Sequence, residues 1–343
     1  MPVAVRFGSE PEFQQEVSSL LSAMRGGPIV CQPLGESEEG RAIMGYVIGS
    51  GPRRVSLIAG SHSDEPVGPE TLRSFIRNCI LTPERWVRYL NDYTFFVIPH
   101  VNPDGEARNR PWIKKWPGLE SYVKHAFREL PGRDVEFGYP EMRVENRLVS
   151  QSMAVNGPFD LHLSLHGMGF SDGALLLIER HWIDRTAILQ TAFSELASRF
   201  GFSLHDHDRK GAKGFRYIGP GFTTTPEGAA MRDHFLAASD PETAGKFHDS
   251  SMEFVRSLGG DPLCLVTELP LFHLTGRPDN EPPGVPEMYM RFKAELGLAR
   301  TSDSGDDVSR LVETFKIVPV PIVKAMKMQM AVIEMGLDCL SEQ

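Results

Sequence analysis

Short apolar runs, each followed by a turn that carries glycine or a polar side chain, recur along the 343-residue chain. Because they are short and rich in β-branched and aromatic residues, they predict buried strands rather than helices. We assign such strands to residues 55–59, 94–98, 159–165, 174–178 and 263–267. Another strand-like stretch, 43–48, precedes a break at Gly49 to Pro52, and this break predicts a β-hairpin with the strand that follows.

Apolar residues at helical spacing predict helices before and between these strands. The first covers Glu10 to Met24 and ends before a pair of glycines. We expect further helices over about 66–79, 141–155, 181–200 and 308–337. Strands and helices alternate, with no internal repeat, low-complexity tract or clear linker. The pattern therefore predicts one α/β domain, residues 1–343, with a largely parallel sheet.

Three stretches lack this periodicity and are predicted to be loops. Residues 106–140 are rich in arginine and lysine, which in an acidic protein suggests contact with anions, although a merely solvated loop would have the same composition. Residues 204–235 are rich in glycine and threonine, and 280–286 form a proline-rich turn. Within the second loop, His and Asp alternate over 205–208, where we expect an exposed loop rather than a metal site.

Composition and charge narrow the class of protein. The formal net charge is −9 and the pI is near 5.7, which argues against a nucleic acid or an anionic membrane as a partner. The first ten residues show no secretory pattern, and no apolar run approaches the roughly 18 residues of a membrane span. Four scattered cysteines predict reduced thiols. We therefore expect a soluble, cytoplasmic protein, whose oligomeric state the sequence leaves open.

Four of the predicted strands are followed by side chains that could do chemistry. These groups are His62 with Glu65, Asn102 with Asp104, His166, and Glu268. If the strands are parallel, their carboxyl ends meet at one rim of the sheet. Two histidines and a glutamate there suit a zinc ion with three protein ligands and a fourth position for water. A second glutamate would take the proton from that water as general base.

The same residues carry a resemblance to a known family. The motifs are Gly35-Glu36-Ser37 with Gly40-Arg41, the strand into 62–65, Asn-Pro-Asp-Gly at 102–105, the strand into His166, and Thr-Glu-Leu-Pro at 267–270. In order and spacing, the chain resembles the metallocarboxypeptidases typified by carboxypeptidase A. The resemblance implies a single three-layer α/β/α domain with a mixed, mainly parallel sheet. It also implies one zinc (Zn2+) per chain, held by His62, Glu65 and His166, with Glu268 as general base.

Two histidines compete for one ligand position. His162 and His166 lie on the same face of a predicted strand, about 13 Å apart, so one zinc cannot take both. His166 stands at the predicted strand end before Gly167, and the family pattern of an Asp six residues before the ligand fits Asp160. We therefore assign His166 as the ligand and expect His162 to be a buried, hydrogen-bonded residue or a more distant pocket residue.

Arginines near the second motif are predicted to serve the substrate. By resemblance, Arg108 or Arg110 would polarise the scissile carbonyl, and Arg128 would bind the substrate carboxylate. Asn102 and Asp104 are further candidates for substrate binding. Phe127 stands where the family has Asn, which weakens the expectation of strict recognition of a free C-terminal carboxylate. A second Asn-Arg pair, at 146–147, is interpreted as a helical surface pair.

These features predict a zinc-dependent hydrolase that cleaves an amide bond adjacent to a carboxylate, by a zinc-bound water that a glutamate activates. Its expected substrate is a peptide or an acyl-amino acid. One alternative is a deacylase or amidase of N-acyl amino acids on the same fold. Another is a catalytically silent member that binds a ligand, which the presence of all three ligand residues and Glu268 disfavours. Specificity resides in the loops, so the sequence leaves the substrate open.

Overall fold

The computed structural model describes residues 6–23, 29–278, 281–301 and 305–341. The strands are β1 (Ile29–Glu36), β2 (Ala42–Gly49), β3 (Arg53–Ala59), β4 (Tyr93–Ile98), β5 (Leu161–Ser171), β6 (Leu175–Ile178), β7 (Tyr217–Gly219), β8 (Phe222–Thr224), β9 (Leu263–Leu274) and β10 (Ile317–Pro319). The helices are α1 (Glu10–Ala23), α2 (Val67–Leu81), α3 (Val87–Asp92), α4 (Pro103–Ile113), α5 (Leu119–His125), α6 (Val144–Asn156), α7 (Ala187–Arg199), α8 (Gly228–Ala237), α9 (Pro241–Ala244), α10 (Ser251–Ser257), α11 (Glu287–Thr301), α12 (Gly305–Phe315) and α13 (Ile322–Ser341). Short 3-10 helices cover Pro83–Arg85, Val135–Phe137, Arg180–Thr186 and Ala212–Gly214.

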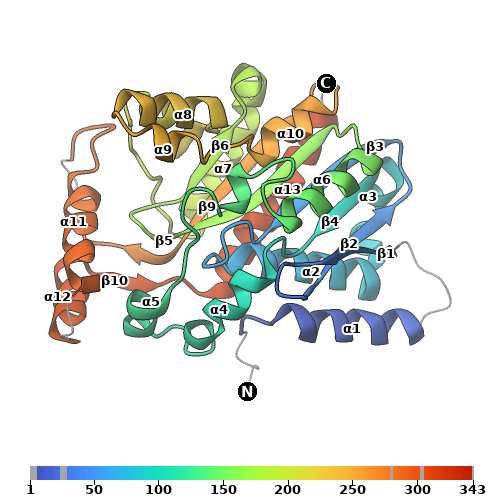
Figure 1. Ribbon diagram of the computed structural model, residues 1–343, viewed down its shortest axis with the longest axis horizontal. Helices are drawn as coiled ribbons and strands as arrows, with labels where there is room; N and C mark the ends of the chain where they lie inside the picture. Colours follow the sequence, from blue (N-terminus) through green and yellow to red (C-terminus); the bar gives the residue numbers. More distant parts are fainter. Residues whose placement is uncertain (1–5, 24–28, 279–280, 302–304, 342–343) are drawn as a thin grey trace.

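The described strands form one mixed sheet in the order β1-β2-β4-β3-β5-β9-β6-β8-β7, with β10 paired to β9 (Figure 1). The four central strands β4, β3, β5 and β9 run parallel. From β3 the chain passes through α2 to β4 on one side and later returns to β5 on the other side. The crevice between β3 and β5 is therefore the place where winding reverses, which is where open α/β sheets bind their ligands.

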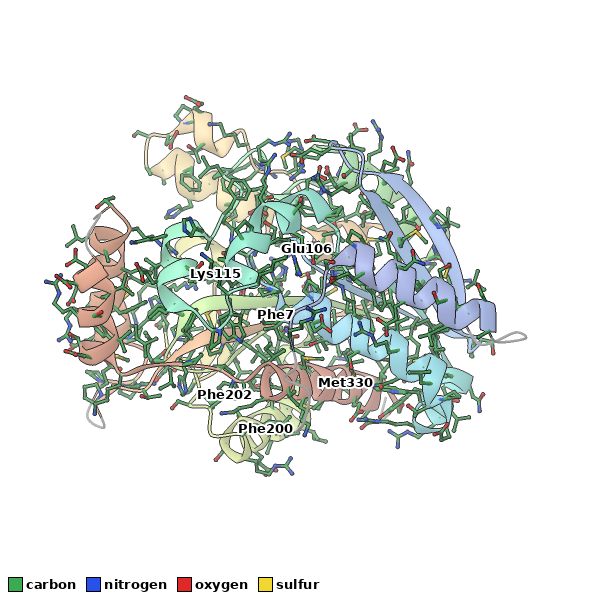
Figure 2. All side chains as sticks on the ribbon, turned by 90° about the horizontal axis from the view of Figure 1, so that it is seen from below. Phe7, Glu106, Lys115, Phe200, Phe202 and Met330 are labelled. Carbon is green, nitrogen blue, oxygen red and sulfur yellow. The ribbon has the colours of Figure 1, made fainter. Side chains whose placement is uncertain are left out.

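Helices cover both faces of the sheet, which makes a three-layer α/β/α fold (Figure 1). On one face α2 and α13 pack on the central strands, with α1 beside α2 and α7 beside α13; Met330 of α13 is labelled in Figure 2. On the other face α6 and α10 cover a smaller cluster. From Val55 onward the strand β3 is buried and mostly apolar because alternate residues reach both cores: Leu57 lies in the larger cluster and Ile58 in the smaller.

The predicted hairpin between 43–48 and the following strand is wrong. Strands β2 and β3 do not pair with each other, because β4 lies between them, antiparallel to β2 and parallel to β3. The glycines of the break pack against the start of β4: a Cβ on Gly51 would lie 2.1 Å from the backbone nitrogen of Tyr93. Residues 49–52 do form a break between two strands, as predicted. However, β3 is buried on both faces and pairs with β4 and β5 instead of β2.

The prediction of a loop over 106–140 is also wrong in its first half. The Asn-Pro-Asp-Gly motif does not form an isolated turn; Asn102 caps α4 by accepting a hydrogen bond from the backbone N–H of Gly105. Helices α4 and α5 follow. The predicted helix over 181–200 begins as a 3-10 helix, and α8 begins at Gly228 inside the second predicted loop. Helix α11, which follows the proline-rich turn, was not predicted. Among the described helices, none is long and apolar enough to cross a membrane.

Candidate metal centre

His166 and Glu268 lie side by side on two neighbouring strands at the centre of the sheet. Both were predicted at strand ends, but both lie inside long strands, where they are direct partners in the parallel pairing of β5 and β9. Partners in a sheet point to the same face. Strand β3 ends at Ala59, opposite Leu165, so His166 is the next residue of β5 and lies just beyond the end of β3. His166 is therefore open to the crevice because β3 ends beside it, although its own strand, β5, continues.

His62 and Glu65 enter the crevice from the turn between β3 and α2. Gly60 begins this turn with φ of +75°, and a Cβ there would lie 2.5 Å from the His100 ring, so glycine is required. The backbone N–H of Glu65 donates to the carbonyl of His62, which closes the turn. Both side chains thereby point toward β5.

The predicted ligand atoms converge. Nδ1 of His166 lies 3.0 Å from Nδ1 of His62 and 2.9 Å from a carboxylate oxygen of Glu65. Nδ1 of His62 lies 3.0 Å from the other oxygen of Glu65. All the donor atoms of this cluster lie within 4.8 Å of one another. Two ligands of one tetrahedral zinc are about 3.3 Å apart, so the set of two imidazoles and one carboxylate fits a zinc ion in type and spacing.

Two acidic residues that the sequence did not single out hold the histidine rings. Nε2 of His62 lies 3.4 Å from Asp134, and Nε2 of His166 lies 3.2 Å from Glu136. A carboxylate on the second nitrogen fixes the tautomer and orientation of a metal-binding histidine. In the sequence, the only feature that distinguishes Asp134 and Glu136 is that two acidic residues stand close together in a stretch otherwise rich in arginine and lysine. Asn146, predicted to lie on the surface, is buried and donates to the carbonyl of Val135, which lies between them.

The charges of the cluster suit a cation. Burial opposes ionisation of Glu65, but Arg128 and the two histidines outweigh it and hold the pKa of Glu65 well below its usual range. Burial also disfavours the charged form of His166, yet Glu65 and Glu136 outweigh it and raise the pKa of His166 to about 9. Without a metal, the carboxylates therefore hold a proton where a cation would bind, and metal binding must displace it.

Glu268 lies between two cavities beside this cluster. One, here called the basic cavity, has a volume of about 360 Å³, and its walls include Tyr122, Phe170, Tyr289, Phe292, Lys293 and Arg300. The other, the apolar cavity, has a volume of about 110 Å³, and its walls include Phe137, Leu177, Phe215, Met252 and Val266. One carboxylate oxygen of Glu268 is buried without a hydrogen-bond partner among the described residues. Burial, reinforced by Glu65, raises the pKa of Glu268 to about 7. Such a carboxylate can accept a proton near neutral pH.

Comparisons with known proteins agree with this geometry. The model of the zinc carboxypeptidase family matches residues 19–117, which contain His62 and Glu65. Zinc carboxypeptidase A 1 of Drosophila melanogaster is 26% identical over 161 residues, which cover 38% of this chain. Over these residues the chain is similar to the zinc carboxypeptidases. The match spans 37% of the Drosophila protein.

Solved structures show that the carboxypeptidase-like fold extends over almost the whole chain. A metallo-carboxypeptidase from Burkholderia cenocepacia aligns over 96% of this chain and 70% of its own, with a TM-score of 0.54 and 15% identity. Carboxypeptidase A from Helicoverpa armigera aligns over 94% of this chain and 74% of its own, with a TM-score of 0.50 and 12% identity. At these identities the likeness establishes the fold, which confirms the predicted α/β/α architecture.

Of the three predicted substrate arginines, the structure brings one to the site. Arg128 lies on a wall of the basic cavity, where its Nε donates to Asp64 at 2.6 Å and its Nη2 to Glu65. Arg108 is half exposed and pairs with Glu39 at 2.5 Å. Arg110 donates to the backbone carbonyl of Gly8 at 2.7 Å. Neither lines the two cavities beside Glu268, so their position does not support the predicted catalytic role.

Asn102 and Asp104 support the site rather than face it. Both are buried. Besides capping α4, Asn102 donates to Glu129, and Asp104 accepts hydrogen bonds from Ser37 and Arg41. The packing of α4 in turn fixes the turn that carries the ligands. A substrate would have to displace these bonds to reach either side chain, so their position does not support substrate binding.

The remaining histidines lie apart from the cluster. His162 is buried, and its ring nitrogens lie 3.0 Å from Ser56 and 3.3 Å from Ser251, as expected for a hydrogen-bonded core residue. The stretch 205–208 is not an exposed loop at its start, because His205 is buried with Nδ1 2.5 Å from Asp172. In the described part of the chain, only the cluster around His166 brings three or more potential ligands together.

Proposed function

We propose that this protein is a zinc-dependent hydrolase that cleaves an amide bond adjacent to a carboxylate, with a peptide as substrate. One observation carries the proposal. The cluster of His62, Glu65 and His166 lies beside Glu268, which lines both cavities and has one carboxylate oxygen without a hydrogen-bond partner in the described part of the chain. A scissile bond above the cluster would leave one half of the substrate in each cavity. The similarity to zinc carboxypeptidases supports the same class of reaction.

Each residue has a separate part in this proposal. Zinc, held by the two histidines and Glu65, would act as a Lewis acid toward the scissile carbonyl and make water more acidic. Glu268 accepts a proton from the attacking water and returns it to the leaving nitrogen, so the amide C–N bond breaks as the C–O bond forms. Asp134 and Glu136 keep both Nδ1 atoms directed at the cluster.

The test of this function is Glu268→Gln, which fills the same space but cannot accept the proton. We expect the variant to retain its zinc and its fold while kcat falls by about 10²–10⁴-fold. The substrates are peptides with free and with blocked C-termini, together with N-acyl amino acids, so that a peptidase and a deacylase are distinguished. Glu242→Gln, on the exposed surface of α9, is the control. A near-normal rate in Glu268→Gln would refute the assignment of the base.

A further inference from the structure

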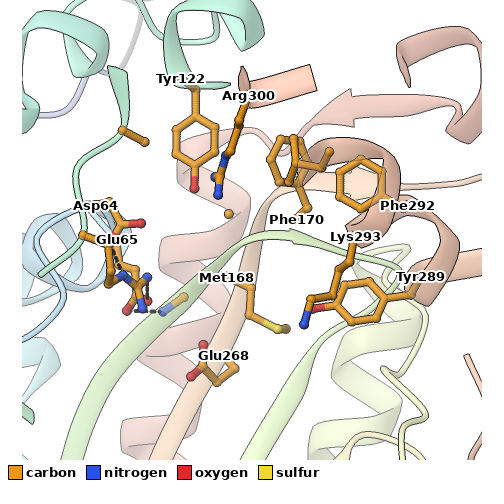
Figure 3. A pocket seen from close by; sticks show the side chains of 15 residues that line it. Asp64, Glu65, Tyr122, Met168, Phe170, Glu268, Tyr289, Phe292, Lys293 and Arg300 are labelled. Carbon is orange, nitrogen blue, oxygen red and sulfur yellow. Dashed lines mark hydrogen bonds and ion pairs between the residues drawn. The ribbon is translucent and has the colours of Figure 1, made fainter. Parts of the chain in front are cut away.

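The basic cavity combines aromatic walls with positive charge beside the proposed reaction centre. Figure 3 shows Phe170 between Tyr122 and Phe292, and the ring of Phe170 contacts both of these rings; Tyr289 and Glu268 also line the cavity. A volume of about 360 Å³ is in the range of small-molecule sites. The cavity can therefore cover a substrate group with a flat or apolar body.

Helix α11 places both unassigned cations in this cavity. Tyr289, Lys293, Leu296 and Arg300 follow one another at spacings of four, three and four residues, so they share one face of the helix. All four line the cavity. In Figure 3 the Lys293 ammonium group lies beside Tyr289, and the Arg300 guanidinium lies beside Tyr122. As whole residues, Lys293 and Arg300 are exposed to solvent, although Lys293 is partly covered.

The walls of the cavity carry three cations and three carboxylates, but these groups are not evenly paired. On the opposite wall, the carboxylates of Asp64 and Glu65 are both paired with Arg128. In contrast, no carboxylate in the described ranges forms an ion pair with Lys293 or Arg300. Partial burial, with further repulsion from other cations nearby, lowers the pKa of Lys293. An anion that entered the cavity would meet two cations without having to break an existing pair.

We propose that the basic cavity binds a substrate carboxylate carried on an aromatic or apolar body, and that Lys293 and Arg300 select it. This inference rests on the proposed hydrolase function and names its substrate class: an acidic peptide. The guanidinium of Arg300 can hold a carboxylate through two parallel hydrogen bonds, and Lys293 adds a second charge. Arg108 and Arg110, in the segment where the sequence predicted anion contacts, lie outside this cavity. The apolar cavity would take an uncharged side chain from the other side of the scissile bond.

The kinetic test uses short peptides in which each position in turn carries glutamate or glutamine. In the wild type, one position should favour glutamate by at least about tenfold in kcat/KM. In the double variant Lys293→Met/Arg300→Met this preference should fall by about tenfold to a hundredfold, mainly through a higher KM for the glutamate peptides. Arg291→Met is the matched control, because Arg291 lies on the same helix with a largely exposed side chain.

A binding measurement separates this inference from the proposed function. Calorimetry on the zinc-loaded proteins compares 3-phenylpropanoate with its uncharged amide. Zinc contributes equally to carboxylate binding in the wild type and in the double variant. The difference between the two proteins in their preference for the acid over the amide therefore measures the contribution of Lys293 and Arg300. Loss of the acid preference in the double variant supports the proposal even if no peptide is cleaved, in which case the hydrolase function alone fails. An unchanged preference in the double variant overturns the proposal, whatever the turnover.

Discussion

Replacing Arg73 with methionine should destabilise the protein more than any comparable change on the same helix. Arg73 lies in α2, directly after the turn that carries the ligands, and its side chain is 2% exposed. Its Nη2 lies 2.9 Å from Glu10 of α1 and 2.8 Å from Glu106 of α4. Glu106 also accepts a hydrogen bond from the backbone N–H of Glu10, and Figure 2 shows it next to the start of α1. One guanidinium therefore joins three helices.

The expected loss follows from burial. Removing one partner of a buried ion pair leaves uncompensated charge and costs about 3–5 kcal/mol. With a urea m-value of about 3 kcal/mol/M, the midpoint should fall by about 1–1.7 M. Burial raises the pKa of Glu106, but Arg73 outweighs it and lowers the pKa below its ordinary value. This pair therefore stabilises the protein at neutral pH. The contribution is lost as the pH falls through the lowered pKa, so the deficit of the variant should shrink in acid.

Urea unfolding of Arg73→Met and Arg77→Met, each at neutral and acid pH, tests this reasoning. Arg77 lies one turn further along α2 and pairs with Glu16 at 2.8 Å and with the buried Glu70 at 3.2 Å, but the side chains of Arg77 and Glu16 are 25% and 41% exposed. Such a pair is worth at most about 1 kcal/mol. Equal losses in the two variants would refute the argument that burial, rather than the number of ion pairs, sets the cost. A deficit that persists at low pH would show that the carboxylates are not its source.

Two further predictions concern the metal. His166→Ala should lose the single zinc that elemental analysis of the wild type detects, whereas His162→Ala should keep it; zinc retained in His166→Ala alone would overturn the ligand assignment. Glu136→Gln should lower zinc affinity by about 10–100-fold in competition with a chromophoric chelator. The control is the variant Glu179→Gln, because Glu179 is also a buried carboxylate and lies 2.8 Å from His181. This control variant should bind zinc like the wild type. Equal zinc affinities in Glu136→Gln and Glu179→Gln would exclude a supporting role for Glu136.

The sequence alone determined the central strands and the main site residues. The central strands are covered on both faces, so runs such as 55–59 and 94–98 are mostly apolar, and that signal is local. His62 and Glu65 follow such a run directly, and His166 and Glu268 interrupt two others, so each stands out against its surroundings. The resemblance to metallocarboxypeptidases rests on the same residues, and the fold and family comparisons confirm it.

Strand pairing was not determined locally. Gly49 to Pro52 has the composition of a hairpin turn, yet β4, more than 30 residues further on, inserts between the two strands. The free energy that decides between these pairings comes from burying both faces of β3 under helices, and a turn contributes little to it. This burial depends on helices that are distant in the sequence, so the residues next to the turn cannot predict it.

Only the tertiary structure identified the residues that surround the centre. Asp134 and Glu136 reach the histidines through a segment with no regular hydrophobic pattern, and their partners lie 72 and 30 residues away in the sequence. Helix α11 was not predicted because apolar residues lie on both of its sides. Phe292 and Leu296 are buried, whereas Met290 and Leu298 are exposed, so the hydrophobic pattern shows no single face. Only the packing of this helix against other elements shows that Lys293 and Arg300 line a cavity, because the other walls of that cavity come from distant parts of the sequence.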